Sequence, residues 1–306
     1  MLKYVLKRIL IGLITLLALI VITFLLVRLM PGNPFDLDNL TPANQEEMMH
    51  HYGLDRPLIE QLGQYIRNLL HGDFGISFKK SGITVSSLIR QKAPATMRLG
   101  GIAFLIALLL GTVIGIAMAV TGHEFVRGTL LTFSTLGISV PNYVLALILM
   151  LLFGVQLKWF PVLGLGTPMH YVLPVITLAV YPIAQISRLV KSSYSEAMQQ
   201  DYAVMAKAKG ISPRRITFLH ILKNAVIPVV TAAGPMIAFL LTGSFVVETI
   251  FTIPGIGREF VTAVSNRDYT VVMGLTIFIG ALIILCNLIA DLLCALLDPR
   301  IRLTDS

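Results

Sequence analysis

The chain has 306 residues, of which 56% are hydrophobic and only 13% are charged, and its mean hydropathy is +0.82. Such a composition lies far outside the range of soluble domains and requires a lipid bilayer. We therefore predict an integral, multi-pass protein of the cell (cytoplasmic) membrane. The formal net charge of +8 reflects basic residues whose distribution sets the orientation discussed below.

Six uncharged runs are long enough to cross the membrane as helices. One crossing takes about 17 to 25 mostly apolar residues, and suitable runs lie at 9–27, 99–122, 128–157, 171–187, 224–247 and 269–290. The first run is longer than the core of a signal peptide and has no small-x-small cleavage site after it. We predict an all-α integral membrane protein with six transmembrane helices.

A long segment separates the first two predicted spans and divides the chain into three parts. Residues 1–30 hold the N-terminal cytoplasmic end and the first span, 31–93 form an extracytoplasmic region, and 94–306 form a core with five spans. Within the middle part, Thr41-Pro42 opens a predicted helix that ends near Gly53, and a second predicted helix runs from Pro57 to Leu70. Either an ordered outer cap or a surface hairpin without function fits this pattern.

Basic residues orient the predicted spans. The two short outer loops hold only Lys158, Arg258 and Arg267, whereas most of the other Lys and Arg gather on the opposite side. An excess of basic residues marks the cytoplasmic side of a membrane protein. We predict that both termini and Lys207 are cytoplasmic and that Asn39 is outside.

A polar, basic segment at 191–226 lies between the fourth and fifth spans. Gly210 is placed to end a helix in the left-handed conformation, and Ser212-Pro213 then supplies an N-cap and a proline at the first helical position. A DNA-binding helix-turn-helix, a solvated basic loop and a docking knob all share this pattern. Because the segment is too short to complete the core of a DNA-binding domain, the pattern favours a docking knob and no nucleic-acid partner.

The chain carries few groups for chemistry of its own. It has no Gly-Lys dipeptide, so the usual phosphate-cradling loop is absent, and any ATP must be bound by partner chains. The histidines are scattered without the spacing of metal ligands. Cys286 and Cys294 are about 12 Å apart along a helix, too far for a disulfide. We expect no metal site and no bound cofactor.

Polar residues in or near the spans are the remaining candidates. The charged residues Arg28, Arg188, Glu248 and Asp291 lie near predicted span ends, from which they can reach the interface. The amides of Asn142, Gln185 and Asn287 lie in otherwise apolar runs, where each should face another helix or a cavity. Either interhelical hydrogen bonding or a transport path fits these amides. A secondary carrier would be expected to hold acidic groups at mid-membrane. Since the charged residues lie near the span ends, this class of transporter is disfavoured.

Residues 206–210 read Ala-Lys-Ala-Lys-Gly, which resembles the coupling loop of ABC importer membrane subunits in its peptide-transporter variant. Further stretches that resemble this family follow along the whole chain: Met30 to Phe35, Tyr52 to Leu58, Gly72 to Phe78, Ser139 to Asn142, Glu248 to Phe251, Pro254 to Gly257, Asn266 to Tyr269 and Asp298 to Ile301. The chain departs from the pattern at Val204 and Met205, where peptide-type members often carry Arg-Thr.

The resemblance implies a type I ABC importer permease fold and a subunit of an ATP-driven importer of oligopeptides or dipeptides. It also implies a heterodimer with a sister permease, two cytoplasmic ABC ATPases that bind ATP and Mg, and an extracytoplasmic peptide-binding protein. The chain itself would not be an enzyme. Alternatives are an importer of this type for nickel chelates, sugars or haem, a secondary carrier, and a membrane scaffold without transport.

The resemblance and the residue patterns together nominate two sets of site residues. The expected ATPase-coupling set is Ala203, Ala206, Lys207, Ala208, Lys209, Gly210, Ser212, Pro213, Arg214 and Arg215. Within it, Ala203, Ala206 and Gly210 are expected to form one small-residue face toward the ATPase. The expected path or gate set is Asn142, Gln185, Glu248, Pro254, Gly255, Gly257 and Asn287. In this set, Glu248 is expected to hold the turn at 254–257 by a polar contact.

Overall fold

The computed structural model describes residues 2–29, 42–51 and 53–297 of the chain. Apart from one isolated bridge between Ile76 and Thr84, the regular structure in these ranges is helical. The elements are α1 (Leu2–Leu29), α2 (Pro42–His51), α3 (Leu58–Leu70), α4 (Val85–Val120), α5 (Glu124–Ser139), α6 (Asn142–Leu149), η1 (Met150–Gln156), η2 (Pro168–Tyr171), α7 (Val172–Met198), α8 (Asp201–Ala208), α9 (Pro213–Arg215), η3 (Ile216–Ile221), α10 (Leu222–Ala225), α11 (Ile227–Thr242), α12 (Phe245–Ile250), α13 (Ile256–Ser265) and α14 (Tyr269–Leu297).

Five of the six predicted spans are confirmed as helices long and apolar enough to cross a membrane. They cover Val5–Leu29, Val85–Val120, Pro168–Met198, Ile227–Ile250 and Tyr269–Leu296. The predicted span at 128–157 is a bent pair of helices, because α5 and the helix that follows it meet at 104°. Proline disfavours the helical conformation in the residue before it, and Val140, which precedes Pro141, is extended with ψ 119°. If this bent pair is counted as one span, the described chain has six.

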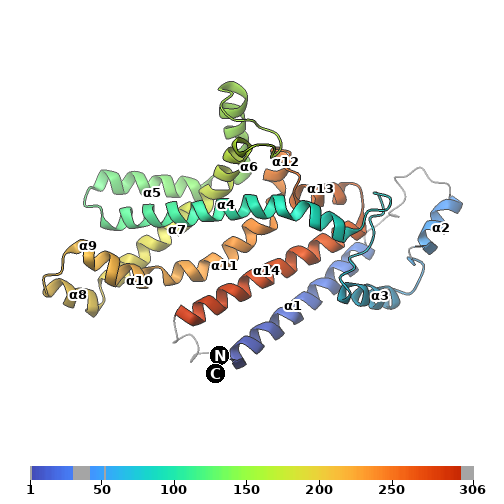
Figure 1. The fold of residues 1–306 in the computed structure, drawn as a ribbon, viewed down its shortest axis with the longest axis horizontal. Helices are drawn as coiled ribbons and strands as arrows, with labels where there is room; N and C mark the ends of the chain where they lie inside the picture. Colours follow the sequence, from blue (N-terminus) through green and yellow to red (C-terminus); the bar gives the residue numbers. More distant parts are fainter. Residues whose placement is uncertain (1, 30–41, 52, 298–306) are drawn as a thin grey trace.

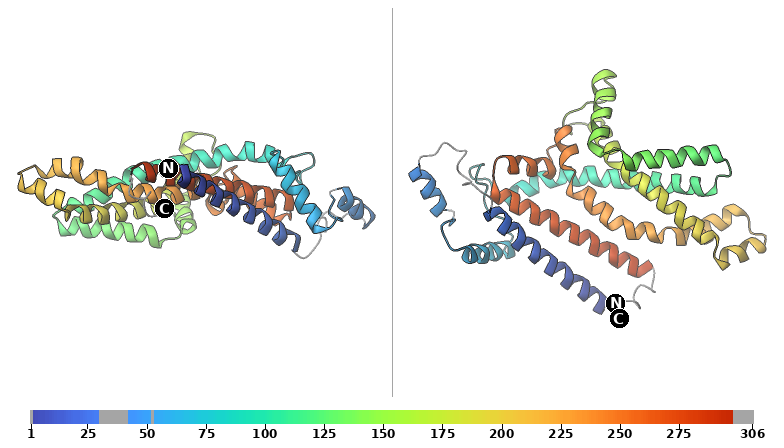
Figure 2. Two further views of the ribbon diagram at one scale, coloured as in Figure 1. Left: turned by 90° about the horizontal axis from the view of Figure 1, so that it is seen from below. Right: turned by 180° about the vertical axis from the view of Figure 1, so that it is seen from behind.

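The long helices run side by side, as Figure 1 shows, with α4 against α7, α11 against α14 and α1 on the outside of α14. The elements α8 to α10 form a knob at one end of the bundle, and α2 and α3 lie at the opposite end (Figures 1 and 2). Helix α6 projects away from the bundle. Near the knob's end of the bundle, Arg8 of α1 pairs with Asp291 of α14 at 2.9 Å.

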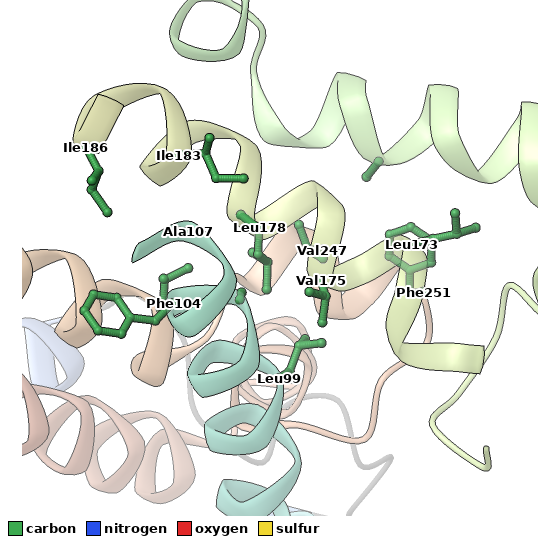
Figure 3. Packing of buried hydrophobic residues seen from close by; sticks show 14 of the residues in the cluster. Leu99, Phe104, Ala107, Leu173, Val175, Leu178, Ile183, Ile186, Val247 and Phe251 are labelled. Atoms are coloured by element: carbon green, nitrogen blue, oxygen red, sulfur yellow. The ribbon is translucent and has the colours of Figure 1, made fainter. Parts of the chain in front are cut away.

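The main core lies where α4, α7 and α12 meet (Figure 3). Its fully buried side chains are aliphatic or aromatic, so the bundle holds together here by apolar packing. The labelled members of this core are Leu99, Phe104, Ala107, Leu173, Val175, Leu178, Ile183, Ile186, Val247 and Phe251.

The outer segment contains the two helices predicted from the sequence, now seen as α2 and α3. Residues 71–84 then return to the turn between α13 and α14. The hydroxyl of Ser77 donates to Asp268, the N–H of Phe78 donates to Asp268 Oδ1 at 3.1 Å, and Lys80 pairs with Glu259. Two stretches far apart in sequence, 72–78 and 266–269, therefore meet in space. Asn39 and the stretches at 30–35 and 298–301 lie outside the described residues.

Candidate functional site

The knob has the predicted sequence of helix, break and helix. Gly210 has a φ of +73°, in the left-handed region that favours glycine. Its N–H donates to the carbonyl of Lys207 at 3.0 Å, and the N–H of Ile211 donates to the carbonyl of Ala206 at 3.2 Å. This pair of bonds is the Schellman motif, which ends a helix and satisfies its last carbonyls. Pro213 then begins α9 after Ser212, whose hydroxyl makes no capping bond.

The predicted small-residue face of the knob is wrong in its direction. Ala203 is 2% exposed and Ala206 is 5% exposed, and both pack inside the knob against Tyr194 and Ile216. Their small side chains let α8 approach the end of α7 closely, so they shape the knob rather than its outer surface. The outward residues of the predicted set are Lys207, Ala208, Lys209, Gly210, Ser212, Pro213 and Arg215, while the side chain of Arg214 is outside the description.

Two exposed apolar side chains extend the outer surface of the knob. Val204 and Met205 are each 57% exposed. They occupy two of the positions where the chain departs from the peptide-type pattern, so this departure falls on the surface. Any partner that contacts this surface meets these apolar side chains.

A buried hydroxyl pair ties the knob to α7. The Tyr194 hydroxyl lies 2.8 Å from Thr217 Oγ1, which donates to the carbonyl of Pro213 at 3.0 Å. Since buried hydroxyls are costly without partners, this chain fixes the position of α9 and η3 relative to α7. Sequence reasoning missed both residues, because a single sequence gives no sign that positions 194 and 217 meet.

Glu248 is the centre of the outer turn. Its carboxylate is 1% exposed; Oε1 accepts the hydroxyl of Thr96 at 2.8 Å and Oε2 accepts the N–H of Arg258 at 3.0 Å. The Thr96 oxygen in turn accepts the N–H of Ile256 at 2.9 Å. Both N–H groups belong to the first turn of α13, where a negative charge is stabilised by the helix dipole. The carboxylate therefore holds α4, α12 and the start of α13 together.

Neighbouring glycines leave room for the Glu248 carboxylate. A Cβ atom at Gly255 would lie 2.3 Å from Glu248 Oε2 and 2.5 Å from Thr96 Oγ1, and one at Gly243 would lie 2.6 Å from Oε1. A Cβ atom at Gly257 would lie 3.0 Å from Oε2. Pro254, by contrast, is exposed. The expected contact between Glu248 and the turn is present. The expectation that Glu248 reaches the interface is wrong, because the packed turn encloses it.

Two of the predicted path residues line one cavity. Asn142 and Gln185 face a cavity of about 470 Å³ between α6, α7 and α11. Gln185 Nε2 donates to the hydroxyl of Tyr181 at 2.5 Å. The remaining wall is apolar or proline, and no Asp, Glu, Lys, Arg or His is among the residues that line it. The cavity is therefore uncharged.

Three prolines line this cavity: Pro141, which precedes α6, and Pro182 and Pro235, which lie inside α7 and α11. A proline inside a helix has no N–H to donate to the carbonyl four residues earlier. For Pro182 that carbonyl belongs to Leu178, which also lines the cavity. Pro182 therefore leaves the carbonyl of Leu178 without its usual helical donor, a feature that the spacing of polar residues alone did not predict.

The other five members of the path set lie elsewhere, four of them in the outer turn described above. Asn287 is on α14, where its Oδ1 is buried and has no hydrogen-bond partner in the described part of the chain. A Cβ atom at Gly234 of α11 would lie 3.7 Å from that oxygen, so the amide faces a helix interface. Glu248 belongs to the outer turn. The structure therefore divides the predicted path set into a cavity, an outer turn and a helix contact.

We expect Gln185→Leu to lower uptake about two- to tenfold, since a neutral hydrogen bond contributes about 0.5 to 1.5 kcal/mol. Asn287→Leu is the matched control, because it removes an amide of similar size outside the cavity. The assay is uptake by reconstituted complex, normalised to the amount of assembled protein. Equal uptake by both variants would remove Gln185 from the path, and loss of assembled protein in both would assign the amides to packing.

Two family descriptions together match nearly the whole chain. Residues 111–303 match "Binding-protein-dependent transport system inner membrane component", and residues 1–100 match the N-terminal region of such membrane components. The chain belongs to this family. It is a permease subunit in the membrane and not an enzyme; in ABC importers of this kind, partner ATPases hydrolyse ATP and a substrate-binding protein is a further partner.

The chain is similar to known proteins both in sequence and in fold. It is 41% identical over 304 residues to the dipeptide transport system permease protein DppB of Bacillus subtilis (99% of each chain), and 41% identical over 308 residues to the oligopeptide transport system permease protein OppB of Haemophilus influenzae (99% of this chain, 100% of the relative). Among solved structures, a chain of the inward-facing MetNI methionine ABC transporter has a TM-score of 0.60 at 16% identity, covering 69% of this chain and 96% of that one. This likeness confirms the fold.

Proposed function

We propose that this permease imports peptides, as one half of a heterodimer with a sister permease that two cytoplasmic ABC ATPases drive. The observation that carries the proposal is the full-length similarity to permeases named for dipeptide and oligopeptide transport. An extracytoplasmic peptide-binding protein delivers the cargo. The chain binds no cofactor, and ATP and Mg are bound by the ATPases.

The connection between the knob and α7 supports a mechanism for coupling. Closure of the ATPase pair displaces the exposed surface of the knob, and the Tyr194–Thr217 contact transmits the displacement to α7. The same helix carries Tyr181 and Gln185 in the wall of the cavity. A rigid-body movement of α7 therefore changes the cavity when ATP binds, and hydrolysis restores the starting arrangement.

The chemistry of the cavity supports peptide as the cargo. Its amides can bond the backbone of a peptide, which every sequence shares, while an uncharged wall imposes little selection on side chains. Nickel chelates and haem are less suited to this wall, since its lining contains no His, Cys, Asp or Glu. Sugars fit the amides but use the apolar remainder poorly.

Co-purification and uptake test the proposal together. We expect the tagged chain to bring down a second permease and stoichiometric ATPases, and the reconstituted complex with its binding protein to take up labelled dipeptide or oligopeptide in a vanadate-sensitive manner. ATP-driven uptake of a nickel chelate, a sugar or haem, but not of peptide, would contradict the proposal that peptide is the cargo. Uptake without any ATPase would overturn the mechanism in favour of a secondary carrier.

A further inference from the structure

A second, polar pocket lies at the opposite end of the bundle from the knob. It encloses about 360 Å³ between α1, α3, the segment at 73–78 and α14. Figure 2 shows α3 beside the end of α1 in this region. Its polar walls include Arg28, Gln61, Tyr65 and Asp73, and its apolar walls include Phe24 and Met273. Neither the cavity nor the coupling knob shares any of these residues.

Several polar atoms of this pocket are buried without a partner. Within the described residues, Arg28 Nε, Gln61 Oε1 and the Tyr65 hydroxyl make no hydrogen bond. The whole Gln61 residue is only 9% exposed, and its amide nitrogen is already committed to the carbonyls of Leu54 at 3.1 Å and Arg56 at 2.7 Å. The orientation of the amide is thereby set, so Oε1 remains an acceptor for something else. Buried polar groups in native proteins nearly always have partners.

The polar groups of this pocket fall into two opposite kinds. Arg28 supplies a cation, with its guanidinium carbon 5.4 Å from the centre of the Phe24 ring, and Tyr65 supplies a hydroxyl donor. Burial, together with the nearby charge of Asp73, raises the pKa of Tyr65, so this hydroxyl keeps its proton. Gln61 Oε1 supplies a buried acceptor. Asp73, which is exposed and whose Oδ1 already accepts the N–H of Gly75 at 2.8 Å, supplies a carboxylate to the same lining. A ligand that satisfies both kinds of group carries an anion and an ammonium a few ångströms apart.

The position of the pocket identifies the source of such a ligand. Arg28 is the last residue but one of α1, at the outer end of a span whose apolar side chains are largely exposed along its length. Such a surface faces lipid, and its outer end lies at the level of the headgroups. Phe24 and Met273 continue the apolar surface into the pocket. On α3, Ile59 is 77% and Leu70 is 82% exposed, as in a helix that rests on a membrane surface.

We propose that this headgroup pocket binds a zwitterionic phospholipid with a primary ammonium, that is, a phosphoethanolamine headgroup from the outer leaflet. The phosphate lies against Arg28 and Tyr65, and the ammonium against Asp73 and the carbonyl of Gln61. Trimethylated choline has no N–H to donate, so the acceptors discriminate against it. A bound lipid would fasten α3 to α1 and α14 and so stabilise the outer region.

Lipid retention by the assembled transporter tests this inference. The complex is purified in detergent from mixed bilayers of phosphatidylethanolamine, phosphatidylcholine and phosphatidylglycerol, and native mass spectrometry counts the lipids retained. We expect phosphatidylethanolamine to be enriched, and Arg28→Gln to reduce its retention about tenfold through loss of a charge-assisted contact. Arg67→Gln, on the exposed side of α3, is the matched control and should retain lipid as the wild type does.

Smaller changes keep the test independent of folding. Tyr65→Phe removes only a hydroxyl, and Asp73→Asn should raise phosphatidylcholine relative to phosphatidylethanolamine if the carboxylate selects the ammonium. Retention that is equal for the three lipids, or unchanged in both of these variants, would overturn the proposal. So would displacement of the lipid by a dipeptide but not by soluble phosphoethanolamine, because the pocket would then be a peptide site. Each readout is independent of the cargo that the cavity transports.

Discussion

A Gly210→Val variant is expected to remain in the membrane with its sister permease but to lose its ATPases. Gly210 sits at a φ of +73°, and a β-branched residue in this conformation costs about 1 to 3 kcal/mol. The position is exposed and a Cβ atom there meets nothing within 4 Å of the chain itself. The substitution therefore strains the Schellman turn and adds a side chain to the docking surface. We expect ATPase co-purification and uptake to fall about tenfold or more.

Two further variants separate strain from bulk at this turn. Asparagine tolerates the left-handed conformation, so Gly210→Asn keeps the turn while adding a side chain to the surface. If Asn couples well and Val does not, backbone strain is the cause; if both fail, the partner needs the surface to be bare. Lys207→Ala should have a mild effect, since an exposed ion pair contributes only about 0 to 1 kcal/mol. Full coupling in Gly210→Val would show that this segment is an ordinary basic loop and not a docking knob.

Gly255→Ala is expected to disrupt the outer turn and abolish most uptake. The added methyl would lie 2.3 Å from Glu248 Oε2 and 2.5 Å from Thr96 Oγ1, so the carboxylate must leave its donors. A buried polar group deprived of a partner costs about 1 to 3 kcal/mol, and more when it is charged. Gly101→Ala on α4 is the matched control, because a Cβ atom there meets nothing within 4 Å.

Glu248→Gln tests the same turn without changing its volume. The amide nitrogen is a donor, so at least one of its contacts with Thr96 or the N–H of Arg258 becomes unfavourable. We expect lower uptake and faster proteolysis at 254–257 than in the wild type. Unchanged uptake and unchanged protection in both Glu248→Gln and Gly255→Ala would show that the turn has no part in transport.

The sequence predicted the helices better than the contacts between them. Uncharged runs located five spans because the bilayer imposes a length on any helix that crosses it. They did not predict the bend of the sixth at Val140-Pro141, because hydropathy does not register the effect of proline on the backbone. The local signals at Gly210 and Pro213 predicted the break in the knob correctly, since both depend only on neighbouring residues.

Direction and pairing were the parts that a single sequence could not supply. The helical spacing of Ala203 and Ala206 predicted a shared face but not which neighbour that face meets, and the neighbour is the end of α7. Likewise Glu248 was recognised as a polar group at the outer turn, whereas its partner Thr96 lies 152 positions earlier. Spacing along one element says nothing about a partner at that distance in the chain.

The contacts of the outer segment impose an order on biogenesis. Ser77 bonds Asp268 across 191 positions, and Lys80 bonds Glu259 across 179, so neither partner exists when the ribosome has made only the first two spans. Contacts so remote in sequence form late, after the intervening chain is placed. Residues 71–84 therefore cannot make these contacts until α13 and the turn before α14 have been synthesised. A chain truncated before Glu259 lacks both of these partners.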